Sequence, residues 1–273
     1  MGAEGSLVKT LAATLAGASR NQDRYVIGER FAAVLDGATS VAGDRSHDPG
    51  WYAEQLADAI EKTVPQGGSL AGAVEEAIRA VRDAHGLTAE TTPTSTVALA
   101  RWSNDTVETY MLGDSYGVIF YADGTEAVHT DDRLDAVAVN ERAAYRKRLA
   151  EGHGYDKGHR ALMLDLQAEQ ARRCNRPEGY WIAGAHPEAA RHGITSVEGR
   201  AGVSALVLAS DGVDPARHPE ATTWHDLYDE ARQHGPAHVL QRIHEAESTD
   251  PGGQRWPRAK LHDDKTLVCV PLA

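Results

Sequence analysis

The stretch LASDGV, residues 208–213, follows an apolar run, and VLDGAT, residues 34–39, follows another in the same way. Each pattern predicts a buried strand that ends in an aspartate followed by a glycine. A single Asp-Gly pair usually marks no more than a turn. Two such pairs after two apolar strands indicate that the chain twice brings a carboxylate to a strand end, at Asp36 and at Asp211.

The composition is that of an ordinary folded protein. The chain has 273 residues, 41% of them hydrophobic and 25% charged, which suits one domain with a sizeable core. Its net charge of −12 opposes binding to the phosphate backbone of nucleic acid, so no nucleic-acid partner is expected. The excess of acid either serves solubility or gathers carboxylates around cations. The sequence leaves the oligomeric state open.

Neither a membrane nor an oxidising compartment is indicated by the sequence. No apolar run approaches the ~20 residues that cross a bilayer. The N-terminal stretch lacks the basic and apolar segments of a secretory signal. The two cysteines, Cys174 and Cys269, are far apart and lack zinc-site spacing. We therefore expect a cytoplasmic protein without a membrane partner.

Strand patterns and helical patterns occur in separate blocks. Short apolar or alternating runs predict strands in four stretches, residues 7–35, 94–129, 180–209 and 266–272. The second of these stretches is typical of an antiparallel meander, with tight hairpins at Asn104-Asp105 and Asp123-Gly124. Helix pairs are expected at about 48–85 and 224–243. Because strands and helices do not alternate one by one, we expect an α+β fold of mostly antiparallel sheets with helices on their outer faces.

Residues 132–176 differ from the rest of the chain in charge. They carry ten of the 28 Lys and Arg residues against seven acids, and their composition favours helix. Two interpretations remain open: a solvated helical face, or a surface that meets an anionic substrate.

Further acids occupy comparable places along the chain. Asp23 precedes the strand pattern RYVIG, and Asp263 with Asp264 precedes KTLVCV. Acids at strand ends can converge on one edge of a sheet, where they repel each other and have raised pKa values unless cations neutralise them. Mg²⁺ and Mn²⁺ prefer carboxylate, carbonyl and water oxygens. The pattern therefore favours a site for hard divalent metals.

Taken together, these motifs resemble those of the protein phosphatase 2C family, the metal-dependent Ser/Thr phosphatases. The resemblance rests on six segments in the family's order, NQDRYVIGERFAAVLDG, TSTVALARW, YMLGDSYGVIFYADG, HTDDR, LVLASDGV and DDKTLVCV. It runs from about Asn21 to Val270 and is similar to single-domain actinobacterial members. It implies a four-layer αββα sandwich of two antiparallel sheets flanked by helix pairs. We expect residues 1–273 to form one such domain, with 132–176 as a helical, flap-like insertion.

The resemblance also implies roles for individual residues. Asp36 would bridge two metal ions, with the Gly37 carbonyl oxygen completing one coordination shell. Asp211 and Asp263 would bind one ion, and Asp23 would hold the other partly through water. Asp114 would join Asp211 at a third, weaker site. The cofactors would be two or three Mn²⁺ or Mg²⁺ ions, and Asp36 and Asp211 would act in catalysis through a metal-activated water.

Several positions depart from the family pattern. Where members often carry a phosphate-binding arginine, five residues ahead of the first acid, this chain has Ala18, and Arg20 is the nearest substitute. Three arginines of the flap segment could grip phosphate or could be ordinary surface residues: Arg172, Arg173 and Arg176. Ala38 stands where some eukaryotic members have a histidine proposed as the acid, which leaves protonation of the leaving group to water or another residue. His262, beside Asp263, could support the metal centre or face the substrate.

The leading hypothesis is a metal-dependent phosphomonoesterase that acts on phosphoserine or phosphothreonine in proteins. One alternative is a pseudophosphatase that binds a phosphorylated partner, which Ala18 in place of an arginine would favour. Another alternative is a phosphatase for a small phosphorylated metabolite. The sequence does not discriminate among these substrates.

Overall fold

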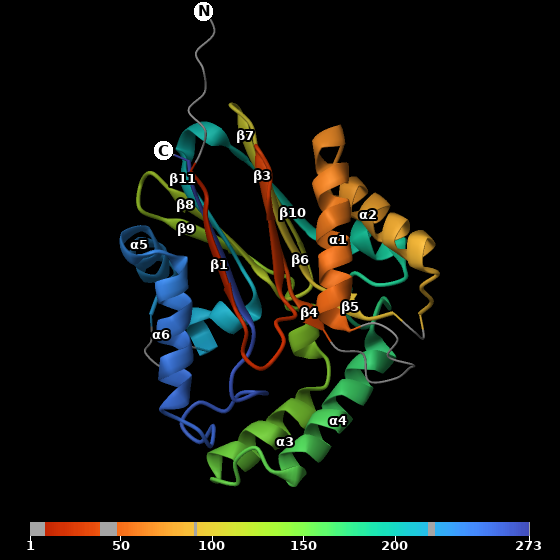
Figure 1. The fold of residues 1–273 in the computed structure, drawn as a ribbon, viewed down its shortest axis with the longest axis vertical. Coiled ribbons are helices and arrows are strands. Elements are labelled where there is room, and N and C mark those ends of the chain that lie inside the picture. The colour runs from red at the N-terminus through yellow and green to blue at the C-terminus, as the bar shows by residue number, and fades with distance from the viewer. Residues whose placement is uncertain (1–8, 39–47, 90–91, 218–221, 273) are drawn as a thin grey trace, which may run out of the picture.

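Two five-stranded antiparallel sheets form the centre of the protein (Figure 1). The computed structural model describes residues 9–38, 48–89, 92–217 and 222–272. In spatial order the first sheet contains β1 (Leu11–Leu15), β12 (Lys265–Pro271), β11 (Val203–Ala209), β8 (Tyr116–Tyr121) and β9 (Glu126–His129). The second contains β10 (Ile194–Gly199), β7 (Thr106–Leu112), β6 (Val97–Trp102), β3 (Phe31–Leu35) and β2 (Arg24–Ile27). A short ribbon pairs β4 (Gly37–Ala38) with β5 (Thr94–Ser95).

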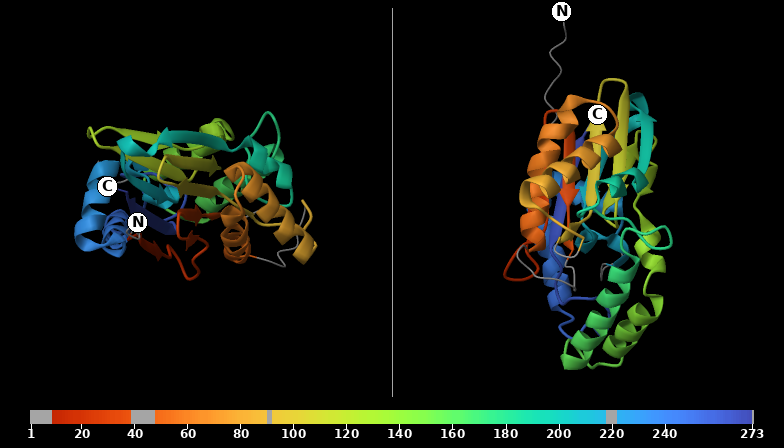
Figure 2. Two further views of the ribbon diagram at one scale, coloured as in Figure 1. Left: turned by 90° about the horizontal axis from the view of Figure 1, so that it is seen from above. Right: turned by 90° about the vertical axis from the view of Figure 1, so that its right-hand side faces the viewer.

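A helix pair covers the outer face of each sheet, as Figures 1 and 2 show from three directions. Helices α1 (Pro49–Thr63) and α2 (Leu70–His85) pack against the second sheet. Helices α5 (Trp224–His234) and α6 (Pro236–Ser248) pack against the first. The expected four-layer αββα sandwich is therefore confirmed.

Alternation along the buried strands separates the layers of the core. On β3, Ala33 and Leu35 join the core shared with α1 and α2, whereas Ala32 and Val34 face the other sheet. Every residue of this strand is buried, as an apolar run without polar alternation predicts for a strand covered on both faces. The ends of β3 and β11 are consequently held by packing on two sides.

The helix ends follow the local sequence. The Asp48 side chain caps α1 by accepting from the Trp51 amide, and proline stands at the first helical position. Gly86 ends α2 in the left-handed conformation, with φ of 62°. Thr223 and Asp226 form a reciprocal capping box at the start of α5. These local signals determine where the helices of the outer layers begin and end.

Residues 94–129 form two hairpins, but the expectation of a single meander was wrong. β7 pairs with β6 in one sheet, and β8 pairs with β9 in the other. The crossing between sheets occurs at Gly113, whose φ of 84° suits glycine because it has no Cβ. A pattern of alternating residues predicts a strand but not the sheet to which it belongs.

Residues 132–176 form two helices at one end of the sandwich (Figure 1). α3 (Val139–Ala150) and α4 (Lys157–Arg173) pack on each other around Tyr145, Leu149 and Leu166.

The short 3-10 turns are η1 (Val64–Gln66), η2 (Asp132–Ala136), η3 (Pro187–His192), η4 (Arg200–Gly202), η5 (Asp211–Val213) and η6 (Pro215–Arg217). In the described part of the chain, no helix has both the length and the apolar character needed to span a membrane.

Candidate metal centre

The acids expected to bind metal converge at the end of the sandwich that carries α3 and α4. They come from different strand ends: Asp23 before β2, Asp36 after β3, Asp114 between β7 and β8, Asp211 after β11 and Asp263 before β12. All but Asp23 line a single cavity of about 1060 Å³. Asp23 lies behind them, close enough to Asp36 for its charge to raise the pKa of that carboxyl.

Backbone hydrogen bonds hold Asp36 at the end of its strand. Its amide donates to the Thr96 hydroxyl over 3.2 Å, and its carbonyl oxygen accepts from the Thr96 amide over 2.9 Å. The Thr96 hydroxyl in turn shares a 2.5 Å hydrogen bond with Ser115, next to Asp114. One small network thus positions two of the acids together.

Glycines allow the loops of the centre to touch. A Cβ on Gly37 would lie 2.8 Å from the Gln22 carbonyl oxygen, and a Cβ on Gly212 would overlap the Asp264 carbonyl oxygen. Asp264 closes the same contact, because its carboxylate accepts from the amides of Gly17 and Gln22 over 2.8 Å each. The glycine after each strand-end acid is therefore required by close backbone approach.

Asp23 is a fully buried carboxylate. Neither of its oxygens has a hydrogen-bond partner within the described ranges. Burial raises its pKa to about 7, the nearby hydroxyls of Ser210 and Thr266 lower it, and Asp264 and Asp263 raise it further. Both hydroxyls stand close to the carboxylate, but neither meets hydrogen-bond geometry. An orphaned buried carboxylate is costly unless a cation or a proton accompanies it.

Burial and neighbouring negative charges also raise the pKa values of Asp36 and Asp114. Burial raises the pKa of Asp36 well above its ordinary value, and the charges of Asp23, Asp211 and Asp263 raise it further. Burial raises the pKa of Asp114 to about 7, again with a contribution from Asp211. Without added cations, these acids cannot all ionise near neutral pH.

Two side-chain cations enter the cluster, and the sequence analysis did not anticipate either. Arg217 on η6 places Nη1 2.5 Å from Asp211 Oδ2, and Lys260 places Nζ 2.6 Å from Asp263 Oδ1. Burial opposes the ionisation of Asp211, but Arg217 and Lys260 outweigh it, so its pKa is lowered. If all five carboxylates were ionised, these two cations would leave three negative charges unbalanced.

These residues fit a pair of hard divalent ions. The available donors are carboxylate oxygens and the Gly37 carbonyl, the ligand type that Mg²⁺ and Mn²⁺ prefer. Asp23 supplies the orphaned oxygens, and Asp36 stands where its pKa is sensitive to three other acids. A third ion does not fit equally well, because the charge of Arg217 already lowers the pKa of Asp211 and partly offsets the raised pKa of Asp114.

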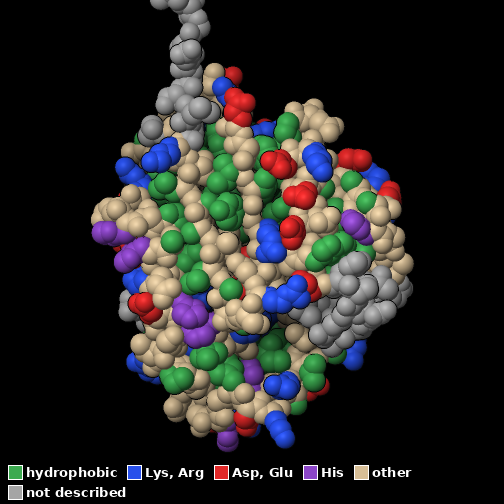
Figure 3. Space-filling model, in the orientation of Figure 1, with side chains coloured by type: hydrophobic (Ala, Val, Ile, Leu, Met, Phe, Trp, Pro, Cys, Tyr) green, Lys and Arg blue, Asp and Glu red, His purple; other side chains and the backbone are tan. Residues whose placement is uncertain are grey.

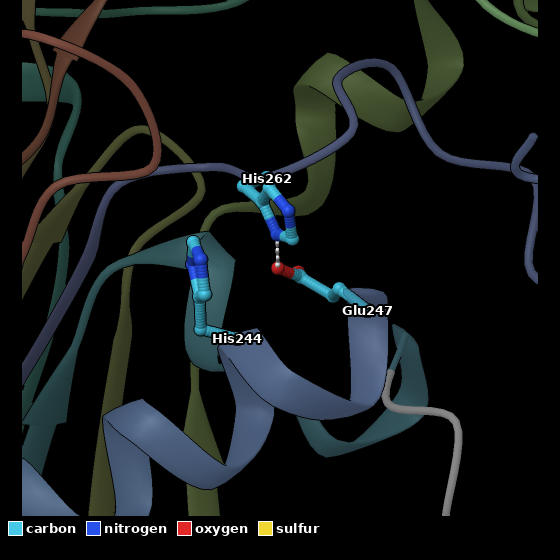
Figure 4. A group of neighbouring side chains, drawn as sticks. All are labelled: His244, Glu247 and His262. Atoms are coloured by element: carbon cyan, nitrogen blue, oxygen red, sulfur yellow. Dashed lines mark hydrogen bonds and ion pairs between the residues drawn. The ribbon is translucent and has the colours of Figure 1, made fainter. Parts of the chain in front are cut away.

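His244, Glu247 and His262 form another group of possible ligands beside the centre (Figure 4). His262 Nδ1 lies 2.9 Å from Glu247 Oε2, and the two imidazoles stack with centroids 3.8 Å apart. The buried Lys265 ammonium lies 2.8 Å from the same Glu247 oxygen and donates to the Asp263 carbonyl. An ammonium on the shared oxygen disfavours a metal there, and stacked rings do not converge on one point. The group instead fastens the segment that carries Asp263.

The arginines expected to bind phosphate are mostly directed elsewhere. Arg20 is exposed and pairs with Asp48, with 2.9 Å between Nη2 and Oδ2. Arg172 and Arg173 both pair with Glu169 on the surface of α4. None of these three lines the cavity, whereas Arg176 does.

The distribution of charged side chains on the surface differs from that inside the cavity. On the face shown in Figure 3, acidic and basic side chains are interspersed, without a broad patch of one sign. The concentration of like charge lies inside the cavity, among the acids at the strand ends.

Solved structures similar to this chain are found by comparison of folds. No protein-family model matches the chain, and no curated protein matches it significantly. The PPM Ser-Thr phosphatase MsPP from Mycobacterium smegmatis, solved with cacodylate, is 19% identical with a TM-score of 0.56. That match covers 98% of this chain and 100% of MsPP.

Two further phosphatases show the same relationship. The catalytic domain of Mycobacterium tuberculosis PstP, solved with two manganese ions, is 15% identical with a TM-score of 0.52 and 97% coverage of each chain. Stp1 from Staphylococcus aureus is 12% identical with a TM-score of 0.56, over 98% of this chain and 96% of Stp1. The chain therefore has the fold of these Ser/Thr phosphatases.

Proposed function

We propose that this chain is a metal-dependent phosphomonoesterase that removes phosphate from phosphoserine or phosphothreonine in proteins. The observation that carries the proposal is the buried Asp23, whose unpartnered oxygens lie behind a cluster with surplus negative charge. A pair of divalent ions would satisfy this carboxylate and neutralise the surplus. The likeness in fold to PPM phosphatases, one of them solved with two manganese ions, supports the same activity.

The two proposed metal ions would be held by residues at the ends of strands from both sheets. The ions would be held by the carboxylates of Asp23, Asp36, Asp211 and Asp263 and by the Gly37 carbonyl oxygen. We propose two Mn²⁺ or Mg²⁺ ions and not three, since Arg217 contacts Asp211 and its positive charge also acts on Asp114.

The chain's own residues would organise the reaction. The bound ions would supply the positive charge that lowers the pKa of a water molecule near phosphorus. Asp36 and Asp211 would hold the ions, because the Thr96 network fixes the Asp36 backbone and the end of β11 places Asp211 beside it. The cavity walls, which include Arg176 and Tyr180, would exclude bulk water and receive the phosphorylated segment.

The setting of the activity is also part of the proposal. Both cysteines, Cys174 and Cys269, are free thiols, which fits a reducing cytoplasm. We propose that the whole chain acts as one catalytic domain, with residues 132–176 as a flap over the cavity. The expected partner is a phosphorylated protein, and neither nucleic acid nor a membrane is involved.

The test is hydrolysis of 4-nitrophenyl phosphate and of a phosphothreonine peptide by the purified chain. Activity should require added Mn²⁺ or Mg²⁺, disappear in chelator, and fall more than about 100-fold in Asp36→Asn, because this change removes a charge that the ions need. The matched control is Asp105→Asn, an exposed acid in the β6–β7 hairpin, which should keep full activity.

Two outcomes would redirect the proposal. Metal binding without turnover of either substrate would favour a binding module for phosphorylated partners. Turnover of small phosphorylated metabolites but not of the peptide would restrict the substrate class.

A further inference from the structure

Lys260 points its ammonium into the acids of the metal centre. Nζ lies 2.6 Å from Asp263 Oδ1, and Asp36 and Asp211 also raise the pKa of this lysine. Its side chain is 57% exposed and lines the cavity, so a ligand can reach it.

The loop that carries Lys260 is built around one buried acid. The Asp250 carboxylate accepts from the amides of Gln254, Arg255 and Trp256 over 3.0 to 3.3 Å. It also pairs with Arg258, with 3.2 Å between Nη1 and Oδ2. Charge-assisted bonds of this kind fix a loop that would otherwise be irregular.

Arg258 fixes the loop from its other end. Its guanidinium donates to the carbonyl oxygens of Glu247, Asp250, Trp256 and Leu261, all within 3.0 Å. This arginine is therefore fully engaged and is not available for a ligand. Its function is to hold the backbone around Lys260.

The helices of the flap segment contact the same backbone. The Tyr155 hydroxyl donates to the Lys260 carbonyl oxygen over 3.3 Å, and His159 Nε2 lies 2.9 Å from the Ala259 carbonyl oxygen. The main chain at Lys260 is thus held by the 249–262 loop, by α6 and by the flap helices. Its position does not depend on the contact with Asp263.

We propose that Lys260 binds a phosphate oxygen of the substrate. The inference rests on the proposed function, because divalent ions must occupy Asp36, Asp211 and Asp263. Once they do, the ammonium loses its carboxylate partner, while the loop still holds the Lys260 backbone beside the cavity, where the side chain can reach a ligand. A positive charge so placed, next to two metal ions, favours binding of an anion, and a phosphate monoester is the anion that the centre would act on.

Two other cations, Arg20 and Arg217, are less suited to this role. Arg20 pairs with Asp48 away from the cavity. Arg217 retains a second acid, because Nε lies 3.4 Å from Asp214 Oδ2 in addition to its contact with Asp211. The described residues offer Lys260 one ion pair only, with Asp263.

The test measures binding of inorganic phosphate to the Mg²⁺-loaded protein by titration calorimetry, for the wild type and for Lys260→Met. The dissociation constant for phosphate should rise at least about 10-fold in the variant, which corresponds to about 1.4 kcal/mol. Affinity for Mg²⁺ alone should stay the same or increase, since a competing cation has been removed. Lys260→Arg should recover part of the phosphate affinity.

Lys147→Met is the matched control, because Lys147 is 78% exposed on α3 and does not line the cavity. It should bind phosphate as the wild type does. Unchanged phosphate affinity in Lys260→Met would overturn the inference, and so would loss of Mg²⁺ binding, which would indicate a structural role. Both readouts are independent of turnover. A protein that binds phosphate through Lys260 but hydrolyses no ester would therefore overturn the proposed function alone.

Discussion

At the scale of single residues, the most informative feature is a carboxylate with no partner. Asp23 is fully buried, and among the described residues neither of its oxygens receives a hydrogen bond. Proteins rarely tolerate such a group unless a proton, a water or an ion accompanies it. The pKa of about 7 indicates that, in the absence of metal, a proton would take this place below neutral pH.

This residue predicts how the metal-free protein responds to pH. The folded-state pKa of Asp23 is raised from 3.8 to about 7, so between about pH 4 and 7 the folded chain retains a proton that the unfolded chain has released. The free energy of unfolding in chelator should therefore fall as pH rises through this window, by up to about 1.4 kcal/mol per pH unit. Urea denaturation at pH 5 and pH 8 measures the difference.

Asp23→Asn is the control for this pH response. It should weaken the decline without abolishing it, because the raised pKa of Asp36 and of Asp114 acts in the same direction. A metal-free wild type that is more stable at pH 8 than at pH 5 would contradict the assignment.

At the scale of elements, the 249–262 loop determines what faces the acids. Asp250 holds three amides and Arg258, and this arrangement presents Lys260. Asp250→Ala removes these bonds and leaves the partly buried Arg258 without its carboxylate partner. We expect the free energy of unfolding to fall by about 2 to 4 kcal/mol and phosphate affinity to fall as it does in Lys260→Met.

The comparison variant is Asp165→Ala, an exposed acid on α4. It should change the free energy of unfolding by less than about 0.5 kcal/mol. If Asp250→Ala lowered stability but left phosphate affinity intact, Lys260 would not depend on this loop for its position.

At the scale of the whole molecule, the candidate metal centre lies where the two sheets meet. Its acids belong to strands of both sheets, which share a core that includes Val34, Leu208 and Val268. Ions bound between these strands should therefore stabilise the sandwich as one unit. This is the physical link between the proposed cofactor and the proposed single domain.

Thermal unfolding with and without Mn²⁺ tests that link. At a metal concentration 100 times the dissociation constant, stability should increase by about 2.7 kcal/mol, seen as a single transition moved to higher temperature. Asp36→Asn should lose most of this increase. Two separate transitions, only one of them shifted by metal, would be inconsistent with a single cooperative domain.

Much of this architecture could be predicted from local patterns. Apolar runs indicated β3 and β11, the Asp48-Pro49 pair indicated the start of α1, and an acid followed by glycine indicated Asp36 and Asp211. Such signals depend on neighbours within a few residues. For that reason they remain valid in the folded protein.

The positions of the cations could not be predicted in this way. Arg20 was expected near phosphate because it is close to the first acid in sequence, but its exposed side chain pairs with Asp48 instead. Lys260 lies in a stretch with no periodic pattern, and its direction depends on Asp250, Arg258 and two residues of the flap segment. A side chain aimed by contacts this distant in sequence leaves no local signal.

The sequence by itself determined the kinds of element, the capping of the helices and the identity of the acids at the strand ends, because each depends on short-range sterics and polarity. The tertiary structure alone decided that β7 and β8 belong to different sheets, that five acids share one end of the sandwich, and that Arg217 and Lys260 enter among them. The strength of an electrostatic interaction depends on the distance between the two charges in space, whatever their separation in the sequence. The balance of charge at the centre therefore exists only once the fold has brought these residues together.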